Sequence, residues 1–412
     1  MTYTSTIIIG AGQCGLAMSA ELSRAGVDHL VLERGPKAGH SWRTERWDSL
    51  RLLTPNSLNG LAGAPFAGRD HDGFMTVDAF VQQFDRAVAR LSPPLVTSTE
   101  VERVSPLAGG YLVDTDRGPI RCDSVVMATG ACAIPKRPAC AAEAPGHLQH
   151  LSPQSYKQPS DVAPGPVLVV GASASGQQIA RELCAAGRDV TLAVGAHVRL
   201  PRRYRDTDIT VWMEILGLFD TRYDQMDDID RVRRTPSLTL AGGDPAETLD
   251  LNVLQEMGVE ITGRMAAIRD GRALFSGSLP AVCKAADLKM ARLLAQVERW
   301  VEGSGLSELI SALEALAPTR VPDAPRLSAD LSRFGSVVWA TGFRPDFSWL
   351  DMDAFDRKGG LIHDGGVVAP GLYAMGLPAM RTRRSSHIDG ALDDAAVLAA
   401  HLMAGLGHAR AA

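Results

Sequence analysis

Three glycines near the start of the chain recur at a fixed spacing. Gly10, Gly12 and Gly15 form the pattern Gly-x-Gly-x-x-Gly. In a strand-to-helix turn, the first glycine allows a tight bend, the second lets a pyrophosphate approach the backbone, and the third lets the helix pack close to the sheet. Free N–H groups at the start of the helix then favour the charge of the phosphates. We therefore expect a nucleotide site here; the alternative is a tight turn without a ligand.

The same pattern returns later in the chain with serine at its middle position. Gly171, Ser173 and Gly176 stand 161 residues after their counterparts in the first loop. The serine makes this signal weaker when it is taken alone. Because the whole unit occurs twice, the sequence nevertheless indicates two nucleotide-binding units in one chain.

The residues that follow each loop distinguish the two expected sites. Glu33 stands where a carboxylate can accept hydrogen bonds from ribose hydroxyls. The second unit has Gly195 at the matching place, followed by Arg199, Arg202 and Arg203. Arginines can bind a ribose 2′-phosphate, and the missing acid removes a source of repulsion. We expect the second site to prefer NADPH to NADH; the alternative is that these arginines lie on a solvated surface loop.

Both loops need a preceding strand and a following helix. Each unit shows short apolar, β-branched runs on either side of a helix-favouring segment. The expected strands are 6–9, 29–32, 167–170 and 190–194, and the expected helices are 16–25 and 177–186. This alternation predicts an α/β fold with two Rossmann-like dinucleotide-binding domains.

The rest of the chain supplies further elements and a domain division. Apolar periodicity predicts helices at 77–91, 251–257, 288–300 and 390–403, and strands at 259–261, 273–275 and 336–340. Residues 36–75 are irregular, and residues 159–166 form a proline-rich joint. We expect a discontinuous first domain of 1–160 and 325–412, and a second domain of 165–324 that carries a helical insertion.

Composition disfavours several classes of function. The 412 residues carry a net charge of -5, whereas a general nucleic-acid-binding protein needs a basic surface. The sequence shows no run of about 20 apolar residues that would suggest a membrane span, and no secretory signal. The six cysteines form no Cys-x-x-Cys pair, and the ten histidines lack metal-ligand spacing. We expect a cytoplasmic protein without a metal site, and a homodimer remains open.

Several further segments resemble the class B flavoprotein monooxygenases, which include the flavin-containing monooxygenases. Residues 128–130 and 340–342 each read Ala-Thr-Gly, like the two crossings of that family. Residues 144–150 are similar to its Phe-x-Gly-x-x-x-His signature, with alanine in place of phenylalanine. Residues 41–43 resemble the segment that passes the flavin. The likeness covers most of the chain except 213–320 and is closest to the CzcO-like oxidoreductases.

This resemblance implies a glutathione-reductase-like fold in which the first site binds FAD and the second binds NADPH. It implies that NADPH reduces FAD by hydride transfer and that the reduced flavin activates O2 as a C4a-(hydro)peroxide. A small organic substrate would then be oxygenated at nitrogen, at sulfur or, in the Baeyer–Villiger manner, beside a ketone. The alternative is an NADPH oxidase or quinone-type flavin reductase without oxygen insertion. Disulfide reduction is disfavoured because the redox cysteine pair is missing.

The glycine loops and the resemblance together give the candidate site residues. Asn56 is the catalytic candidate, because an amide donates and accepts hydrogen bonds without ionising; the alternative is a turn residue after Pro55. The expected cofactor-binding residues are Gly10, Gly12, Gln13, Cys14, Gly15, Glu33, Arg34, Ser41, Trp42, Arg43, Val101, Thr129, Gly130, Gly171, Ser173, Ala174, Ser175, Gly176, Arg199, Arg202, Arg203, Ala340, Thr341, Gly342 and Asp394. The expected walls of the substrate pocket are 51–75, 204–230 and 377–389.

Overall fold

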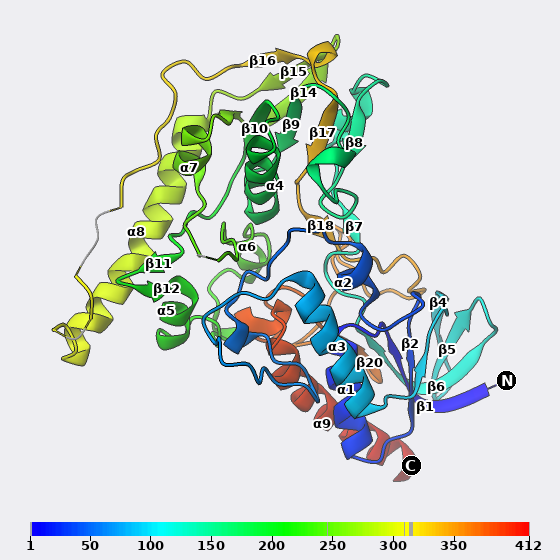
Figure 1. Cartoon of the computed structure of the whole chain (residues 1–412). Coiled ribbons are helices and arrows are strands. Elements are labelled where there is room, and N and C mark those ends of the chain that lie inside the picture. Colours follow the sequence, from blue (N-terminus) through cyan, green and yellow to red (C-terminus); the bar gives the residue numbers. More distant parts are fainter. Residues whose placement is uncertain (1, 245, 309, 313–315, 412) are drawn as a thin grey trace.

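Two β-sheets form the framework of the molecule, one above the other in Figure 1. The computed structural model describes residues 2–244, 246–308, 310–312 and 316–411. The lower sheet is built around the first glycine loop and the upper sheet around the second. Both ends of the chain lie in the lower part of the molecule (Figure 1).

The first sheet has eight strands and a parallel centre. Its main path runs β19 (Val367–Ala369), β20 (Leu372–Ala374), β6 (Ile120–Met127), β1 (Thr2–Ile9), β2 (His29–Leu32) and β3 (Leu95–Val96), and the hairpin β4 (Val101–Leu107) and β5 (Gly110–Thr115) joins at β6. The last six residues of β1 are buried, as expected for an isoleucine-rich strand that is covered on both faces. β20 pairs in parallel with β6, so a strand from late in the chain completes this sheet.

The second sheet has five strands, all of them parallel. Their order is β13 (Glu260–Gly263), β10 (Val190–Val194), β9 (Val167–Val170), β17 (Ser336–Trp339) and β8 (Gln149–Leu151). The first sheet has the same arrangement around its own glycine loop. In the order just given, the five strands correspond to β3, β2, β1, β6 and β20. The expected α/β fold with two Rossmann-like units is therefore confirmed.

Strand pairing corrects two of the expected domain boundaries. β8 pairs with β17, and β17 pairs with β9, so 149–151 and 336–339 belong to the second sheet. The sequence-based division had placed them in the first domain, within 1–160 and 325–412. Pairing between segments this far apart leaves no local signal in the sequence, because it depends on tertiary contacts alone. The rest of the expected division into a first and a second domain stays a prediction.

Helices cover both sheets. α1 (Gln13–Arg24) packs against α9 (Gly390–Ala411) and α3 (Val77–Leu91) beside the first sheet. α4 (Ala174–Ala185) lies on β9 and β10 of the second sheet, next to α7 (Leu251–Glu256). α1 and α4 each begin within a glycine loop, directly after its second position, so their N-terminal N–H groups belong to the loop itself.

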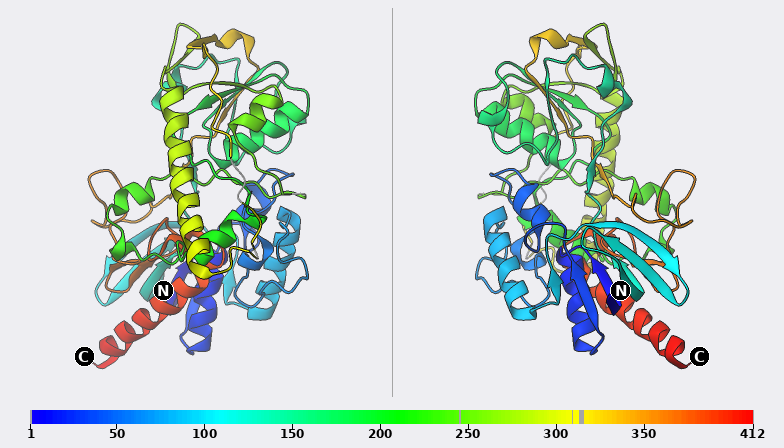
Figure 2. Two further views of the ribbon diagram at one scale, coloured as in Figure 1. Left: turned by 90° about the vertical axis from the view of Figure 1, so that its left-hand side faces the viewer. Right: turned by 90° about the vertical axis from the view of Figure 1, so that its right-hand side faces the viewer.

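A helical insertion packs beside the second sheet. α8 (Leu279–Ser304) has 26 residues and begins earlier than the expected 288, because Pro280 is tolerated in the first turn of a helix. It runs from the second sheet toward the first (Figure 2). Together with α5 (Ile209–Ile215) it encloses a separate small core, in which Trp212 and Trp300 meet edge to face at 5.8 Å.

The remaining elements are short. They are α2 (His40–Thr44), α6 (Ile229–Arg233), β7 (Ile134–Pro135), β11 (Arg203–Tyr204), β12 (Thr207–Asp208), β14 (Met265–Arg269), β15 (Arg272–Phe275), β16 (Ser328–Asp330), β18 (Phe343–Arg344), and 3-10 turns at Asn56–Leu58, Ala139–Glu143, Pro159–Asp161, Tyr223–Gln225, Leu331–Arg333 and Arg383–Ser386. In the part of the chain that the structure describes, no helix has the length and apolar character to cross a membrane.

Candidate active site

In the first glycine loop, two glycines are required by the packing of the protein and the third is not. Gly10 has φ of +102°, and a Cβ there would lie 2.6 Å from the carbonyl oxygen of Ala128. A Cβ on Gly15 would lie 1.9 Å from the oxygen of Gly10. Gly12, in contrast, has φ of -80° and no protein atom within 4 Å of a Cβ. The fold therefore requires Gly10 and Gly15, whereas Gly12 faces open space that fits a pyrophosphate.

The second loop has nearly the same backbone geometry and close contacts as the first. Gly171 has φ of +109°, and its Cβ would lie 2.3 Å from the oxygen of Ala340. A Cβ on Gly176 would lie 1.9 Å from the oxygen of Gly171. Ser173 caps α4 with φ of -81°, and its hydroxyl makes no capping bond. Each loop thus lies against its own Ala-Thr-Gly crossing, which contains Thr129 and Gly130 in the first unit and Thr341 and Gly342 in the second.

Glu33 ties the first loop to the end of β2. Its carboxylate oxygens accept hydrogen bonds from the backbone N–H groups of Ala11, at 2.9 Å, and of Gly35, at 2.8 Å. Because a carboxylate has about four acceptor positions, Glu33 keeps capacity for ribose hydroxyls. Of its expected companions, Arg34 is exposed and Val101 is a half-buried residue at the start of β4.

Two buried oxygen atoms near the first loop have no partner in the described structure. They are Oγ1 of Thr129 and Oδ2 of Asp394. A buried polar atom without a hydrogen bond is costly, so a bound group that pairs with these two oxygens would be stabilised by them. Burial raises the pKa of Asp394 to about 6, although the Ser385 hydroxyl and Arg381 oppose the shift. These residues and the open space at Gly12 fit a hydroxyl-rich dinucleotide such as FAD.

Asp394 also gives a prediction for the flavin-free protein. Because its folded-state pKa lies above its ordinary value of about 3.9, its folding contribution falls as pH rises from about 4 to about 6 and stays low above that range. Asp394→Asn removes the buried charge, so the gain in unfolding free energy over wild type should grow through that range and then level off. Chemical denaturation at about pH 4 and about pH 8 measures it. Asp353→Asn, at an exposed position that does not act on the pKa of Asp394, is the control; an equal gain at both pH values for Asp394→Asn would contradict the assignment.

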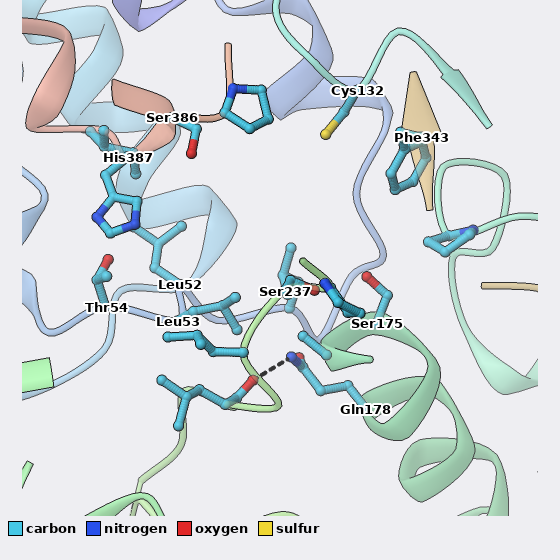
Figure 3. A pocket seen from close by; sticks show the side chains of 18 of the residues that line it. Leu52, Leu53, Thr54, Cys132, Ser175, Gln178, Ser237, Phe343, Ser386 and His387 are labelled. Atoms are coloured by element: carbon cyan, nitrogen blue, oxygen red, sulfur yellow. Dashed lines mark hydrogen bonds between the residues drawn. The ribbon is translucent and has the colours of Figure 1, made fainter. Parts of the chain in front are cut away.

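A cavity of about 550 Å³ lies between the two loops (Figure 3). Gln13 and Trp42 line it from the first unit, and Ala174 and Ser175 line it from the start of α4. The indole N–H of Trp42 donates to Oε1 of Gln13 at 3.3 Å. Apolar side chains close much of the wall, among them Leu52, Leu53, Phe219, Leu240 and Phe343.

Parts of the three segments expected to form the substrate pocket do line this cavity. Lining residues come from the beginning of 51–75, from Thr210 and Phe219 within 204–230, and from 378–388 within 377–389. Residues 45–50 and 232–240 also contribute, and sequence reasoning missed them. Ser41 is half-buried beside the cavity wall, and Arg43 forms an ion pair with Asp85 instead of facing the cavity.

The structure favours the structural alternative for Asn56. Its side-chain amide donates to the carbonyl oxygen of Asp70 at 2.8 Å and accepts from the N–H of Met75 at 2.8 Å. The residue is 5% exposed and does not line the cavity. Both polar atoms of the amide thus hold the irregular loop together, so the expected catalytic role of Asn56 is not part of the function proposed below.

The arginines after β10 are also placed differently from the expectation. Arg199 is buried and pairs with Asp250 at 2.6 Å and with Asp287 at 2.8 Å. Arg202 is 1% exposed, pairs with Asp208 and donates to the carbonyl oxygen of Leu53 at 2.8 Å. Arg199 is thus occupied by two carboxylates from far along the sequence, and Arg202 by one that lies six residues away, which speaks against their binding a phosphate. Arg203 is exposed on β11.

One arginine that sequence reasoning missed lies beside the expected 2′-phosphate position. Arg264 follows β13, and its Cγ lies 3.7 Å from the place of a Cβ on Gly195. Its side chain is exposed and takes part in no ion pair among the described residues. Its place in the sequence could have indicated it. Arg264 directly follows the strand next to β10, and neighbouring parallel strands end at the same edge of a sheet.

The sequence pattern of the pyridine nucleotide-disulphide oxidoreductase family matches residues 7–222, which contain both glycine loops. The chain belongs to this family. It is accordingly an enzyme, an FAD-dependent oxidoreductase that works with a pyridine nucleotide. The open space at Gly12 and the unpartnered oxygens of Thr129 and Asp394 agree with that cofactor.

Among proteins similar to this family member are CzcO-like oxidoreductases and flavin-dependent monooxygenases. An uncharacterized oxidoreductase CzcO of Bacillus velezensis is 26% identical over 393 residues, 95% of this chain and 96% of that protein. The indole-3-pyruvate monooxygenase YUCCA1 of Oryza sativa subsp. japonica is 31% identical over 204 residues, 48% of this chain and 49% of that protein. A flavin-containing monooxygenase from Stenotrophomonas maltophilia has the same fold, with a TM-score of 0.69 at 18% identity over 98% of this chain and 99% of its own. The resemblance to class B flavoprotein monooxygenases is thus confirmed.

The cysteines of this oxidoreductase do not suit the disulfide chemistry in the family's name. All six are free. Burial raises the pKa of Cys14, beneath the first loop, to about 12, and it also raises the pKa of the cavity-lining Cys132. Disulfide exchange needs a thiolate, whose formation these shifts oppose. Among the described residues no cluster of metal-binding side chains is present either.

Proposed function

We propose that this chain is an NADPH-dependent flavoprotein monooxygenase that oxygenates a small organic substrate with O2. The observation that carries the proposal is the pair of matched loops on the two sides of one largely apolar cavity. A dinucleotide on each loop would extend its reactive end toward that cavity. The relatives named as monooxygenases support the same reaction class.

The residues of the chain have separate tasks in this reaction. Bound FAD supplies the acceptor for a hydride from NADPH and the place where oxygen is activated. The N-termini of α1 and α4 hold the two pyrophosphates. Thr129 and Asp394 provide the polar contacts that FAD completes, and Trp42 with Gln13 forms the wall between the first loop and the cavity. The apolar lining excludes water, which protects reactive oxygen species from wasteful breakdown.

Preference for NADPH is part of the proposal. Gly195 leaves the end of β10 without a carboxylate, and Arg264 lies beside it. We expect Arg264→Gln to raise the KM for NADPH by about tenfold or more and to leave the KM for NADH nearly unchanged, since a charge-assisted bond to the 2′-phosphate is lost. Arg203→Gln tests the second exposed candidate. Arg269→Gln, an exposed residue on the neighbouring β14, is the control. Equal changes for both coenzymes would refute the assignment.

A second candidate function is an NADPH oxidase or quinone-type reductase. It is favoured by the position of Asn56, because this residue, the catalytic candidate of the sequence, does not reach the cavity. The two candidates differ in the fate of oxygen. Without a quinone, an oxidase or a quinone-type reductase releases one H2O2 for each NADPH whatever other compound is added, whereas a monooxygenase releases less when its substrate is bound. A peroxidase-coupled assay during NADPH consumption measures this ratio.

A further inference from the structure

The cavity between the loops has an excess of positive charge. Four arginines line it: Arg46, Arg51, Arg233 and Arg383. Among the described lining residues, Glu45 carries the single carboxylate. None of the four arginines takes part in an ion pair within the part of the chain that the structure describes, whereas Arg384, next to one of them, pairs with three carboxylates. An apolar cavity with uncompensated cations favours an anionic guest.

The turn that carries Arg383 is fixed from its inner side. The hydroxyl of Ser385 accepts hydrogen bonds from the backbone N–H groups of Arg381 and Thr382, both at 3.0 Å. Arg384 pairs with Glu214 and Asp389 at 2.7 Å each and with Asp220 at 3.1 Å. These contacts position the 3-10 helix Arg383–Ser386 before a ligand arrives, which lowers the entropic cost of binding.

The outer side of the same turn faces the cavity. Arg383, Ser386 and His387 all line it, while Ser385 and Arg384 point into the protein. Figure 3 shows Ser386 and His387 together on one wall, close to Thr54 and Leu52. Burial lowers the pKa of His387, which favours the neutral imidazole, and this form can donate or accept a hydrogen bond.

Arg233 brings a second cation from another part of the chain. It ends α6, and its Nε atom is buried without a partner. Its guanidinium lies 3.3 Å from Nε2 of His363, whose pKa burial and the nearby arginine lower to about 4. A neutral imidazole holds Arg233 in place without cancelling its charge. The other two lining arginines are more occupied: Arg51 donates to the carbonyl oxygen of Phe74, and Arg46 stacks on Trp42 at 4.6 Å.

We propose that the cavity selects a small organic anion, an apolar molecule with one carboxylate, and that Arg383 and Arg233 bind the carboxylate. The apolar wall formed by Leu52, Leu53 and Phe219 would hold the rest of the molecule. A carboxylate offers two acceptor oxygens to a planar guanidinium, the geometry that arginine binds best. This assignment names the substrate class of the monooxygenase proposed above, and in that sense it rests on the proposed function.

Binding to the oxidised, FAD-loaded enzyme tests the assignment without any oxygenation. The probes are 4-(methylthio)benzoate and 4-(methylthio)benzamide, which have nearly the same size and differ in charge. Isothermal titration calorimetry gives both dissociation constants. We expect the benzoate to bind at least about tenfold more tightly than the benzamide, and Arg383→Gln to remove most of that difference. Arg383→Lys should restore part of it, and Arg234→Gln, an exposed neighbour of Arg233 outside the cavity, should leave it unchanged.

Several outcomes would overturn the assignment. Equal affinity of the wild type for the two probes, or no binding of the benzoate, would show that the cavity does not select a carboxylate. Unchanged benzoate binding together with weaker NADP+ binding in Arg383→Gln would assign this arginine to the coenzyme. A preference for the benzoate in an enzyme that releases one H2O2 for each NADPH would support the anion site and contradict only the proposed oxygenation.

Discussion

Gly12→Val is expected to give a folded protein that purifies without flavin. In the structure a Cβ at this position meets no protein atom within 4 Å, and the extended backbone of Gly12 suits a β-branched residue. The valine methyl groups would instead occupy the space through which a pyrophosphate approaches the loop. The ratio of flavin absorbance to protein absorbance after purification measures retention, and circular dichroism checks the fold.

The second loop offers a matched control for this change. Ser173→Val places the same side chain at the equivalent backbone conformation of the other unit, where Ser173 makes no capping bond that would be lost. This variant should keep its flavin and bind NADPH more weakly. A Gly12→Val protein that purifies fully yellow would show that FAD does not bind at the first loop, and loss of flavin from both variants would point to a general defect of folding.

Arg199→Ala is expected to lower the free energy of unfolding by about 3 kcal/mol, because it leaves one buried and one half-buried carboxylate without their cation. Arg199 is 6% exposed and joins Asp250, which caps α7, to Asp287 on α8. The ion pairs therefore connect two elements of the second unit. Chemical denaturation of the FAD-loaded protein measures the change, with the midpoint and slope compared between variants.

Arg203→Ala is the control for Arg199→Ala. Its exposed side chain makes no ion pair among the described residues, so stability should change by no more than about 0.5 kcal/mol. If Arg199→Ala instead kept its stability and selectively raised the KM for NADPH, the sequence-based assignment of this arginine to the 2′-phosphate would be correct and the structural interpretation wrong.

Local signals predicted several elements of the two units. Strands 29–32, 167–170 and 190–194 and helix 77–91 are observed with the expected bounds. Each has a short apolar run or a clear amphipathic stripe, and each ends at a glycine, an acid or a serine, so neighbouring residues were sufficient to place it. The two glycine loops belong to the same class, since their function depends on residues within one turn.

Features that depend on distant contacts were not predictable in the same way. Arg199 follows a strand that lacks an acid, and only the folded chain brings Asp250 and Asp287 to its guanidinium group. The amide of Asn56 is chemically suited to a functional role, but both of its polar atoms form hydrogen bonds with the backbone of Asp70 and Met75. The four cavity arginines come from three separate segments, with Arg46 and Arg51 in the first of them, so no spacing in the sequence indicates that all four share a cavity.

The central claim is that NADPH reduces this flavoprotein and that the reduced enzyme uses oxygen for insertion. Stopped-flow absorbance tests it most directly: the FAD-loaded enzyme is reduced with NADPH under anaerobic conditions and then mixed with oxygenated buffer, with and without 4-(methylthio)benzoate. We predict rapid bleaching of the flavin by NADPH, followed by a long-lived near-ultraviolet absorbance before the oxidised flavin spectrum returns. Direct return of oxidised flavin with one H2O2 per NADPH under both conditions, or no bleaching at all, would contradict the account.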